Sequence, residues 1–123
     1  KAQAAKTIGL IYGIDENFEV SSTGLVKTEI KPLLGVPAAT TSAPSSGYTY
    51  RHFWIQTAGN FARIEAAAAS ADNAACFSSS TPGKVDDGDD SGYRIRGLIF
   101  TAAAGSATNT TGFSALELFH VPA

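Results

Sequence analysis

Short segments of β-forming residues, separated by turns, fill the second half of the chain and constrain its fold more than any other feature. Three of them join β-branched and aromatic residues over the length of a strand: Arg51–Gln56, Gly92–Thr101 and Ala115–Val121. Strand follows strand without a periodic helix between them. We therefore predict an all-β fold, a single-domain β-sandwich or β-barrel-like structure with long loops of small residues.

The length and the cysteine content fit one domain with an ordinary core. A chain of 123 residues buries about two thirds of the surface that it exposes when unfolded. Cys76 has no partner within the chain, which excludes an intramolecular disulfide and favours an intracellular or virion setting over a small secreted scaffold. Because the sequence contains no methionine, we expect that residues precede Lys1 in the translated protein.

The charge and hydropathy of the chain argue against two classes of partner. A formal net charge of -2 provides no basic field for a nucleic-acid backbone. The apolar run Ile8–Ile14 is far too short to span a membrane. Charged residues make up 16% of the chain, against about 25% in typical proteins, so much of the surface is small and neutral and suits contact with other proteins.

The N-terminal stretch has two interpretations. Alternation places Ile8, Leu10, Tyr12 and Ile14 on one face of a strand, and a polar turn separates this strand from Phe18–Val20. Residues 1–14 are therefore either the first strand of the domain or an N-terminal arm that adds to the sheet of a neighbouring subunit. In both cases residues 15–123 are predicted to form a single β domain.

Three further segments follow before the middle of the chain. Val26–Lys31 alternates apolar and charged residues and predicts a half-buried strand that ends at Pro32. Residues 37–47 hold no apolar side chain larger than alanine after the proline, which predicts a long exposed loop. Thr49–Thr57 predicts a strand with large apolar side chains on both faces, packed on two sides or against another subunit.

The stretch 60–75 admits a helix as well as a strand. Glu65–Ala69 has high helix propensity and Asn60 is a suitable cap, yet the β-type segments on both sides favour an extended chain, so we predict a strand. Shorter β-type pieces follow at 76–80 and around Val85. The last two predicted strands are Tyr93–Phe100 and Phe113–Val121, with a loop over 102–111 between them.

Candidate chemical groups are few. The cluster Asp86, Asp87, Asp89 and Asp90 resembles the start of an EF-hand loop, but Leu98 occupies the position of the bidentate glutamate, which favours an acidic turn without metal. Cys76, His52 and His120 are the only Cys and His residues, and no motif sets their spacing. The sequence contains no GxGxxG, Walker or serine-elbow motif. We therefore predict no catalytic residue, no metal and no cofactor.

The aromatic residues Tyr48, Tyr50 and Trp54 recur at strand spacing. Such a stripe can stack on sugars or bases, but it more often belongs to a core or a subunit interface. Together with the N-terminal stretch it gives the candidate interface Ile8, Leu10, Tyr12, Ile14, Tyr48, Tyr50 and Trp54.

Three stretches, Arg51–Gly59, Ala71–Asp87 and Gly97–Gly105, occur in an order that resembles the small capsid cement, or decoration, proteins of tailed phages. The shared pattern is an FW-x-Q-T strand, a PG-x-VDD turn and a closing G-x-x-x-T strand, and it covers residues 48–123. Cys76 stands where the pattern has an aliphatic residue. The resemblance implies a compact β fold on the outer capsid, at junctions between capsomers, that acts as a small oligomer with a terminal arm.

From the residues and the resemblance together we expect a structural virion protein on the outer capsid surface, and not an enzyme. Its expected partners are the major capsid protein and further copies of itself, with a trimer favoured over a dimer, and neither nucleic acid nor membrane. The alternative is a tail-fibre or baseplate adhesin module that holds a glycan with Tyr48, Tyr50 and Trp54. A third hypothesis is a hydrolase fragment that uses His52 or Cys76.

Overall fold

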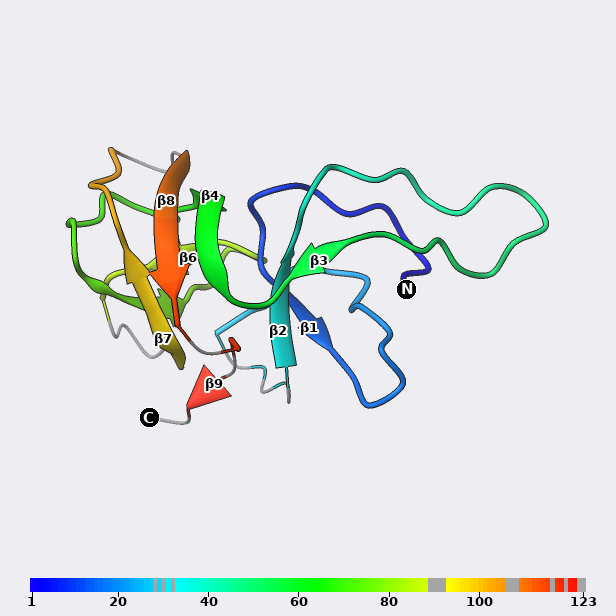
Figure 1. Ribbon diagram of the computed structural model, residues 1–123, viewed down its shortest axis with the longest axis horizontal. Coiled ribbons are helices and arrows are strands. Elements are labelled where there is room, and N and C mark those ends of the chain that lie inside the picture. The colour runs from blue at the N-terminus through cyan, green and yellow to red at the C-terminus, as the bar shows by residue number, and fades with distance from the viewer. Residues whose placement is uncertain are drawn as a thin grey trace.

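The computed structural model describes residues 1–27, 29, 31, 33–88, 93–105, 109–115, 117–118 and 120–121, and these form an all-β structure. Two sheets lie side by side along the long axis of the molecule (Figure 1). The smaller sheet has the strand order β1-β2-β3 and is antiparallel. Its strands are Tyr12–Ile14, Leu33–Pro37 and Ile55–Gln56.

The larger sheet curls into a barrel. Its order is β4-β8-β7-β5-β6, and β9 pairs with β7. A parallel bridge between Ala66 and Val85 joins the end of β4 to β6, and the Ala67 backbone nitrogen donates to the Val85 carbonyl over 2.7 Å. The two ends of the sheet are therefore connected. Its strands are β4 (Gly59–Glu65), β5 (Ala75–Ser78), β6 (Val85–Asp86), β7 (Arg94–Phe100), β8 (Asn109–Ser114) and β9 (His120–Val121).

One core runs through the barrel and under the smaller sheet. Alternation along β7 sends Ile95, Leu98 and Phe100 inward, and all three are completely buried or nearly so. Ile11 and Leu34 from the N-terminal part of the chain pack in the same cluster. A second cluster on the other side of the smaller sheet contains Ala2, Tyr12, Ile14 and Val20, with Leu10, Leu33, Phe53 and Ile55 packed against it.

The N-terminal stretch packs within its own chain, which favours the first-strand interpretation over the arm. Tyr12–Ile14 forms β1, paired in register with β2. The Ile11 backbone nitrogen donates to Gly83, and the Ile11 carbonyl accepts from Leu25, over 2.8 and 2.9 Å. Closer to the terminus, Ala2 is buried and bridges both Val20 and Arg51. The apolar side chains that seemed to need a neighbouring subunit find their cover within the chain.

Several predicted strands differ in extent from those observed. The described residues of 26–31 are not in a strand. The strand predicted there was to end at Pro32, whereas the observed strand β2 begins after that proline. The segment 49–57 forms regular strand only at Ile55–Gln56. The last predicted strand is divided into β8 and β9, and β8 begins at Asn109, inside the predicted loop.

The alternation that predicted these strands fails where other contacts decide the conformation. The Lys27 backbone nitrogen donates to the Ser79 carbonyl at the start of the 79–84 turn, and the Glu29 nitrogen donates to the Val26 carbonyl. The segment therefore forms hydrogen bonds with a loop and within itself. By contrast, the strand prediction for the start of 60–75 is confirmed: β4 occupies Gly59–Glu65 and no helix forms there. The strand predicted over Tyr93–Phe100 is confirmed as β7.

Candidate binding surface

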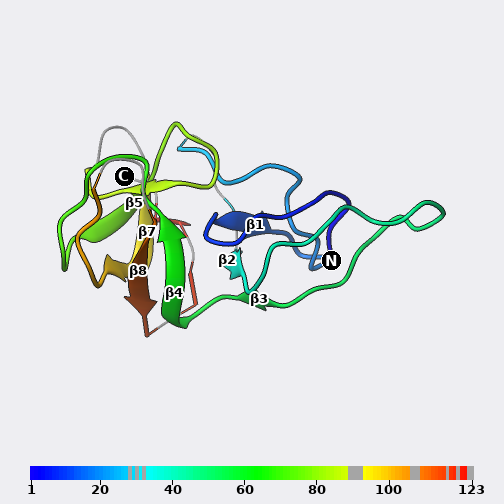
Figure 2. The ribbon, with the colours of Figure 1, turned by 90° about the horizontal axis from the view of Figure 1, so that it is seen from above.

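A long excursion of the chain between β2 and β3, residues 38–54, extends beyond the smaller sheet on the side away from the barrel (Figures 1 and 2). We call it the projection. Its two ends meet where the Ala38 backbone nitrogen donates to the Trp54 carbonyl over 3.1 Å. The predicted exposed loop over 37–47 therefore exists, except that Pro37 is buried at the end of β2.

The N-terminal residues hold both legs of the projection. Lys6 and Thr41 exchange backbone hydrogen bonds of 3.1 and 2.9 Å on one leg, and Ala2 and Arg51 exchange bonds of 2.9 and 2.8 Å on the other. The Thr40 hydroxyl also accepts from the Ile8 backbone nitrogen over 3.2 Å. These bonds fix the direction of the projection before any partner binds.

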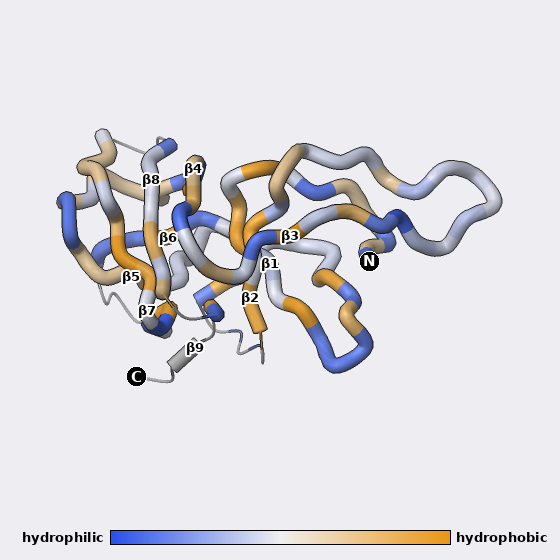
Figure 3. Tube along the Cα trace, in the orientation of Figure 1, coloured by the Kyte–Doolittle hydropathy of each residue, from blue (hydrophilic) through white to orange (hydrophobic). Residues whose placement is uncertain are grey.

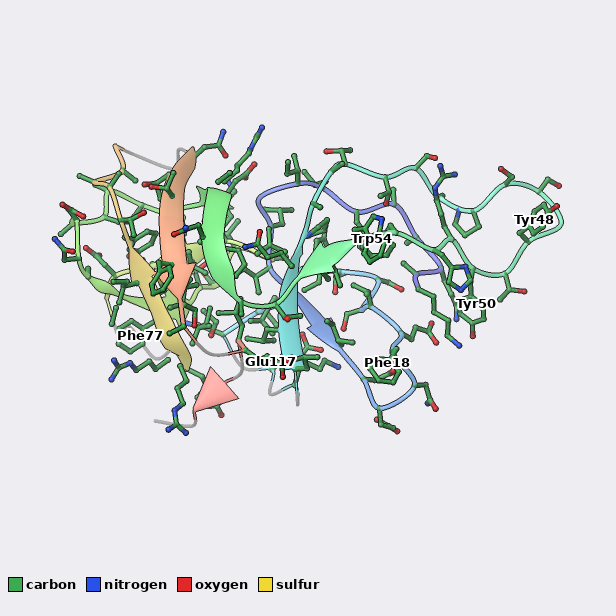
Figure 4. All side chains as sticks on the ribbon, viewed as in Figure 1. Phe18, Tyr48, Tyr50, Trp54, Phe77 and Glu117 are labelled. Atoms are coloured by element: carbon green, nitrogen blue, oxygen red, sulfur yellow. The ribbon has the colours of Figure 1, made fainter. Side chains whose placement is uncertain are left out.

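The outer part of the projection is uncharged and carries exposed aromatic rings. No charged side chain occurs from Pro32 to Tyr50, and Figure 3 shows the projection in pale, intermediate hydropathy. Tyr48 is 74% exposed near the tip, and Trp54 is 87% exposed close to the sheet. Figure 4 shows these two rings well apart along the projection.

Tyr50 does not extend this exposed set. It is half-buried, its ring lies 4.6 Å from the Lys1 Nζ, and its hydroxyl donates to the Glu19 carboxylate over 3.4 Å. Tyr12 and Ile14 are buried in the second cluster, and Ile8 and Leu10 are half-buried. Of the seven residues of the candidate interface, Tyr48 and Trp54 are thus the two that offer an open side chain.

Sequence reasoning missed Phe18. This residue lies in the turn between Asp15 and Glu19, is 73% exposed, and has a φ of 57°, in the left-handed region. Most residues other than glycine and asparagine avoid that conformation. The missed signal was an aromatic residue directly after the turn-forming Asp15-Glu16-Asn17, where we had placed the start of a strand.

The candidate nucleophile is not in a reactive environment. Cys76 is completely buried in β5, and burial, with a smaller contribution from the nearby Asp87 charge, raises the pKa of its thiol. A protonated thiol is a poor nucleophile. His52 is exposed on the projection, and the side chain of His120 lies outside the described part of the structure. The arrangement gives no support to the hydrolase hypothesis.

The acidic turn uses its carboxylates to hold the backbone. Asp86 Oδ1 accepts from the Asp87 backbone nitrogen over 2.8 Å, and Asp87 Oδ2 accepts from the Ala71 nitrogen over 2.7 Å. Asp89 and Asp90, which completed the predicted cluster, lie outside the described residues. Among the residues that are described, no group of three or more His, Cys, Asp or Glu side chains is arranged to hold a metal ion.

A small polar pocket of about 160 Å³ opens beside this turn. Two of its hydroxyl groups are engaged within the chain, since the Ser78 Oγ donates to the Tyr93 carbonyl over 3.3 Å and the Ser79 Oγ donates to the Lys84 carbonyl over 2.9 Å. The pocket thus reflects the packing of the turn. Its lining residues are Lys27, Ala67, Ser78, Ser79, Ser80, Thr81, Asp86 and Gly88.

Lys6 is a buried cation at the base of the projection. Its Nζ donates to the carbonyls of Ser22 and Ala5 over 3.2 and 3.4 Å and lies 5.0 Å from the centre of the Tyr12 ring. The ion pairs among the described residues do not include it. Burial therefore lowers the pKa of Lys6, because desolvation disfavours the charged form.

We predict that Lys6 makes stability rise with pH in the alkaline range. The unfolded chain keeps the ordinary pKa of 10.5 and so binds more protons than the folded chain between the lowered pKa and that value. The penalty for burying the charge is complete below this window and disappears as pH rises through it. At neutral pH we expect Lys6→Met to stabilise the fold by about 1 kcal/mol.

Urea denaturation of both proteins at a series of pH values measures this effect. The advantage of Lys6→Met should shrink as pH rises towards 10.5 and vanish above it, where the lysine is neutral in both the folded and the unfolded chain. A difference that stays constant over the whole series would show that Lys6 is not penalised for its charge.

Comparison with protein-family models, with curated proteins and with solved structures finds no match to this chain. Within the described residues, no helix has the length and apolar character needed to cross a membrane. The surface of the molecule, and above all the projection, is therefore the remaining guide to its function.

Proposed function

We propose that the protein is a structural protein of a phage virion, a cement or decoration protein that binds and stabilises the shell of the major capsid protein. The observation that carries this proposal is the projection, an excursion held at its base by backbone hydrogen bonds, uncharged as far as Tyr50 and with Tyr48 and Trp54 exposed. The resemblance of residues 48–123 to decoration proteins supports the same function. The protein would occupy the outer capsid surface.

The chemistry of the projection suits a protein partner. The buried centres of protein interfaces are depleted in charge and enriched in Tyr and Trp. An interface that removes the Trp54 side chain from water gains about 25 cal/mol for each Å² of apolar surface. The hydrogen bonds at the base of the projection reduce the entropy lost on binding, because the legs are already ordered. Many modest contacts on a closed shell then act together.

Trp54 gives a direct test, because it is the single tryptophan of the chain and is exposed. We expect its fluorescence to shift to the blue when the protein is added to shells purified without it from the phage that encodes the chain. Trp54→Ser and Tyr48→Ser should each weaken cosedimentation with those shells by about 30-fold, as for a central aromatic contact.

Ser45→Ala is the matched control, since Ser45 is exposed on the same projection and carries no ring. It should bind shells like the unchanged protein. Mass spectrometry of complete virions should count hundreds of copies relative to the capsid protein. A handful of copies, or binding that ignores both ring substitutions, would contradict the proposal.

The second candidate is an adhesin module that binds a glycan, and the exposure of Trp54 favours it because an open indole face stacks on sugar rings. The separation of Trp54 from Tyr48, and the engagement of Tyr50 by Lys1 and Glu19, leave it without a continuous aromatic platform. Glycan-array binding that is lost in Trp54→Ser, together with a low copy number in virions, would favour the adhesin.

A further inference from the structure

The turn that carries Phe18 is built to hold an exposed ring in place. The Asp15 carboxylate accepts from the backbone nitrogens of Asn17 and Glu19 over 2.9 and 2.8 Å, and the Phe18 nitrogen donates to the Asp15 carbonyl over 3.0 Å. The Phe18 carbonyl accepts from the Lys1 backbone nitrogen over 2.9 Å. These bonds maintain Phe18 in the left-handed conformation, which residues with a side chain rarely adopt.

The carboxylate next to this ring is free to meet a cation. Glu16 is exposed, and no hydrogen bond or ion pair of its side chain occurs among the described residues. Asp15 is occupied with the backbone, and Glu19 accepts from Gln3 over 2.6 Å. The turn thus presents an aromatic ring beside an unpaired negative charge, a combination that suits an apolar surface with a basic edge.

The outer face of the barrel has that character. Ile99 of β7 pairs in register with Phe113 of β8 and with Ala75 of β5, and side chains opposite each other in such pairs point to the same side of the sheet. Their neighbours along the strands are buried, namely Leu98, Phe100, Gly112 and Cys76, so Ile99, Phe113 and Ala75 point outward. Phe113 is 38% exposed. The three residues form an apolar row across three strands.

Basic residues border this row. Arg94 is exposed and pairs in register with the half-buried Phe77, which places both on the outer face, and Arg96 is exposed two residues further along β7. Asp86 also pairs with Phe77, but its carboxylate accepts backbone hydrogen bonds from Asp87 and Gly88. We call Ala75, Phe77, Arg94, Ile99 and Phe113 the barrel face.

We propose that a second copy of this chain occupies the barrel face through its Phe18 turn, with Phe18 against Ile99 and Phe113 and with Glu16 near Arg94. Charge complementarity between the acidic turn and the basic border selects this occupant. The contact cannot form within one chain, because Phe18 and Phe77 lie at opposite sides of the molecule (Figure 4). It joins two different patches, so each copy donates one turn and accepts another.

This contact goes beyond the proposed function, since it uses no residue of the projection and its test needs no shell. Sedimentation equilibrium of the purified protein should show reversible self-association. Phe18→Ser and Phe113→Ser should each weaken that association by about 30-fold. Both side chains are exposed, so the variants should keep the circular dichroism of the parent.

Mixing the two variants tests which patches meet. The Phe113→Ser chain still has an intact turn, and the Phe18→Ser chain still has an intact barrel face, so an equimolar mixture should form a heterodimer that neither variant forms alone. If Phe18 instead met Phe18 of the other copy, the mixture would gain nothing. A parent protein that stays monomeric at all concentrations would overturn the proposal.

Charge reversal supplies an independent test. Glu16→Arg and Arg94→Glu should each weaken self-association by placing like charges together, and the double variant should recover most of it. Both positions are exposed, so stability should change little. If each single variant is impaired and the double variant does not recover, Glu16 and Arg94 belong to separate contacts. That result would contradict the pairing.

Discussion

Replacing Gly24 by alanine is expected to lower the free energy of unfolding by about 3 kcal/mol. A Cβ at this position would lie 2.5 and 2.6 Å from the backbone nitrogen and Cα of Gly83, closer than real Cβ contacts allow. The atoms in the way belong to the backbone, which cannot rotate aside like a side chain, so the two chain segments must separate. Separation strains the hydrogen bonds of Gly83 with Leu25 and Ile11, of 2.7 and 2.8 Å.

Gly88→Ala is the matched control for this prediction. A Cβ added at Gly88 meets nothing within 4 Å, and its φ is outside the left-handed region, so the change should be within about 0.5 kcal/mol. Urea denaturation followed by circular dichroism measures both variants. Equal stabilities of Gly24→Ala and the unchanged protein would show that the crossing of these two segments is looser than the structure describes.

The fold class and the strands β4 and β7 could be predicted from the sequence. β7 alternates on both sides of Gly97, where two exposed residues follow each other, because one side of the strand faces the core and the other faces solvent. The strand predicted for the start of 60–75 is present for the same reason, since β4 belongs to a sheet in which Phe61 and Ile64 face inward, whereas the alanines 66–69 lie beyond its end.

The smaller sheet was less accessible because loops and isolated bridges build much of it. Val26–Lys31 alternates without forming a regular strand in its described residues, and β2 follows a proline that we read as a terminator. Closing the barrel depends on Ala66 and Val85, two residues with no distinctive pattern. Contacts of this kind depend on tertiary structure that no local window of sequence contains.

The candidate site was predicted in part. Tyr48 and Trp54 were assigned to an interface from their strand spacing, and both are exposed in the structure. Tyr12 and Ile14 were assigned to an interface because residues 1–14 could form an arm on a neighbouring subunit. In the structure both side chains are buried in the second cluster of the same chain. Close packing within the domain accounts for them.

The second large effect concerns the N-terminal stretch. Deleting residues 1–14 is expected to leave a chain that does not fold. The deletion removes Ile11, Tyr12 and Ile14, which are buried, and each such side chain contributes about 1.5–3 kcal/mol by leaving water. It also removes β1, and with it the partner of β2, as well as the bonds from Ile11 to Gly83 and Leu25. These losses are comparable with the whole stability of a domain, about 5–15 kcal/mol.

A shortened projection is the control for this deletion. Removing residues 43–46 takes away exposed or half-buried residues near the tip and none of the backbone pairs at the base, so that protein should unfold cooperatively like the parent. Circular dichroism and amide NMR dispersion compare the two. The truncated chain should give the spectra of an unfolded protein, because the cover over Leu25, Leu34 and Val20 has gone with the first strand. A truncated chain that still folded cooperatively would restore the arm interpretation, since it would show that the domain completes its core without residues 1–14.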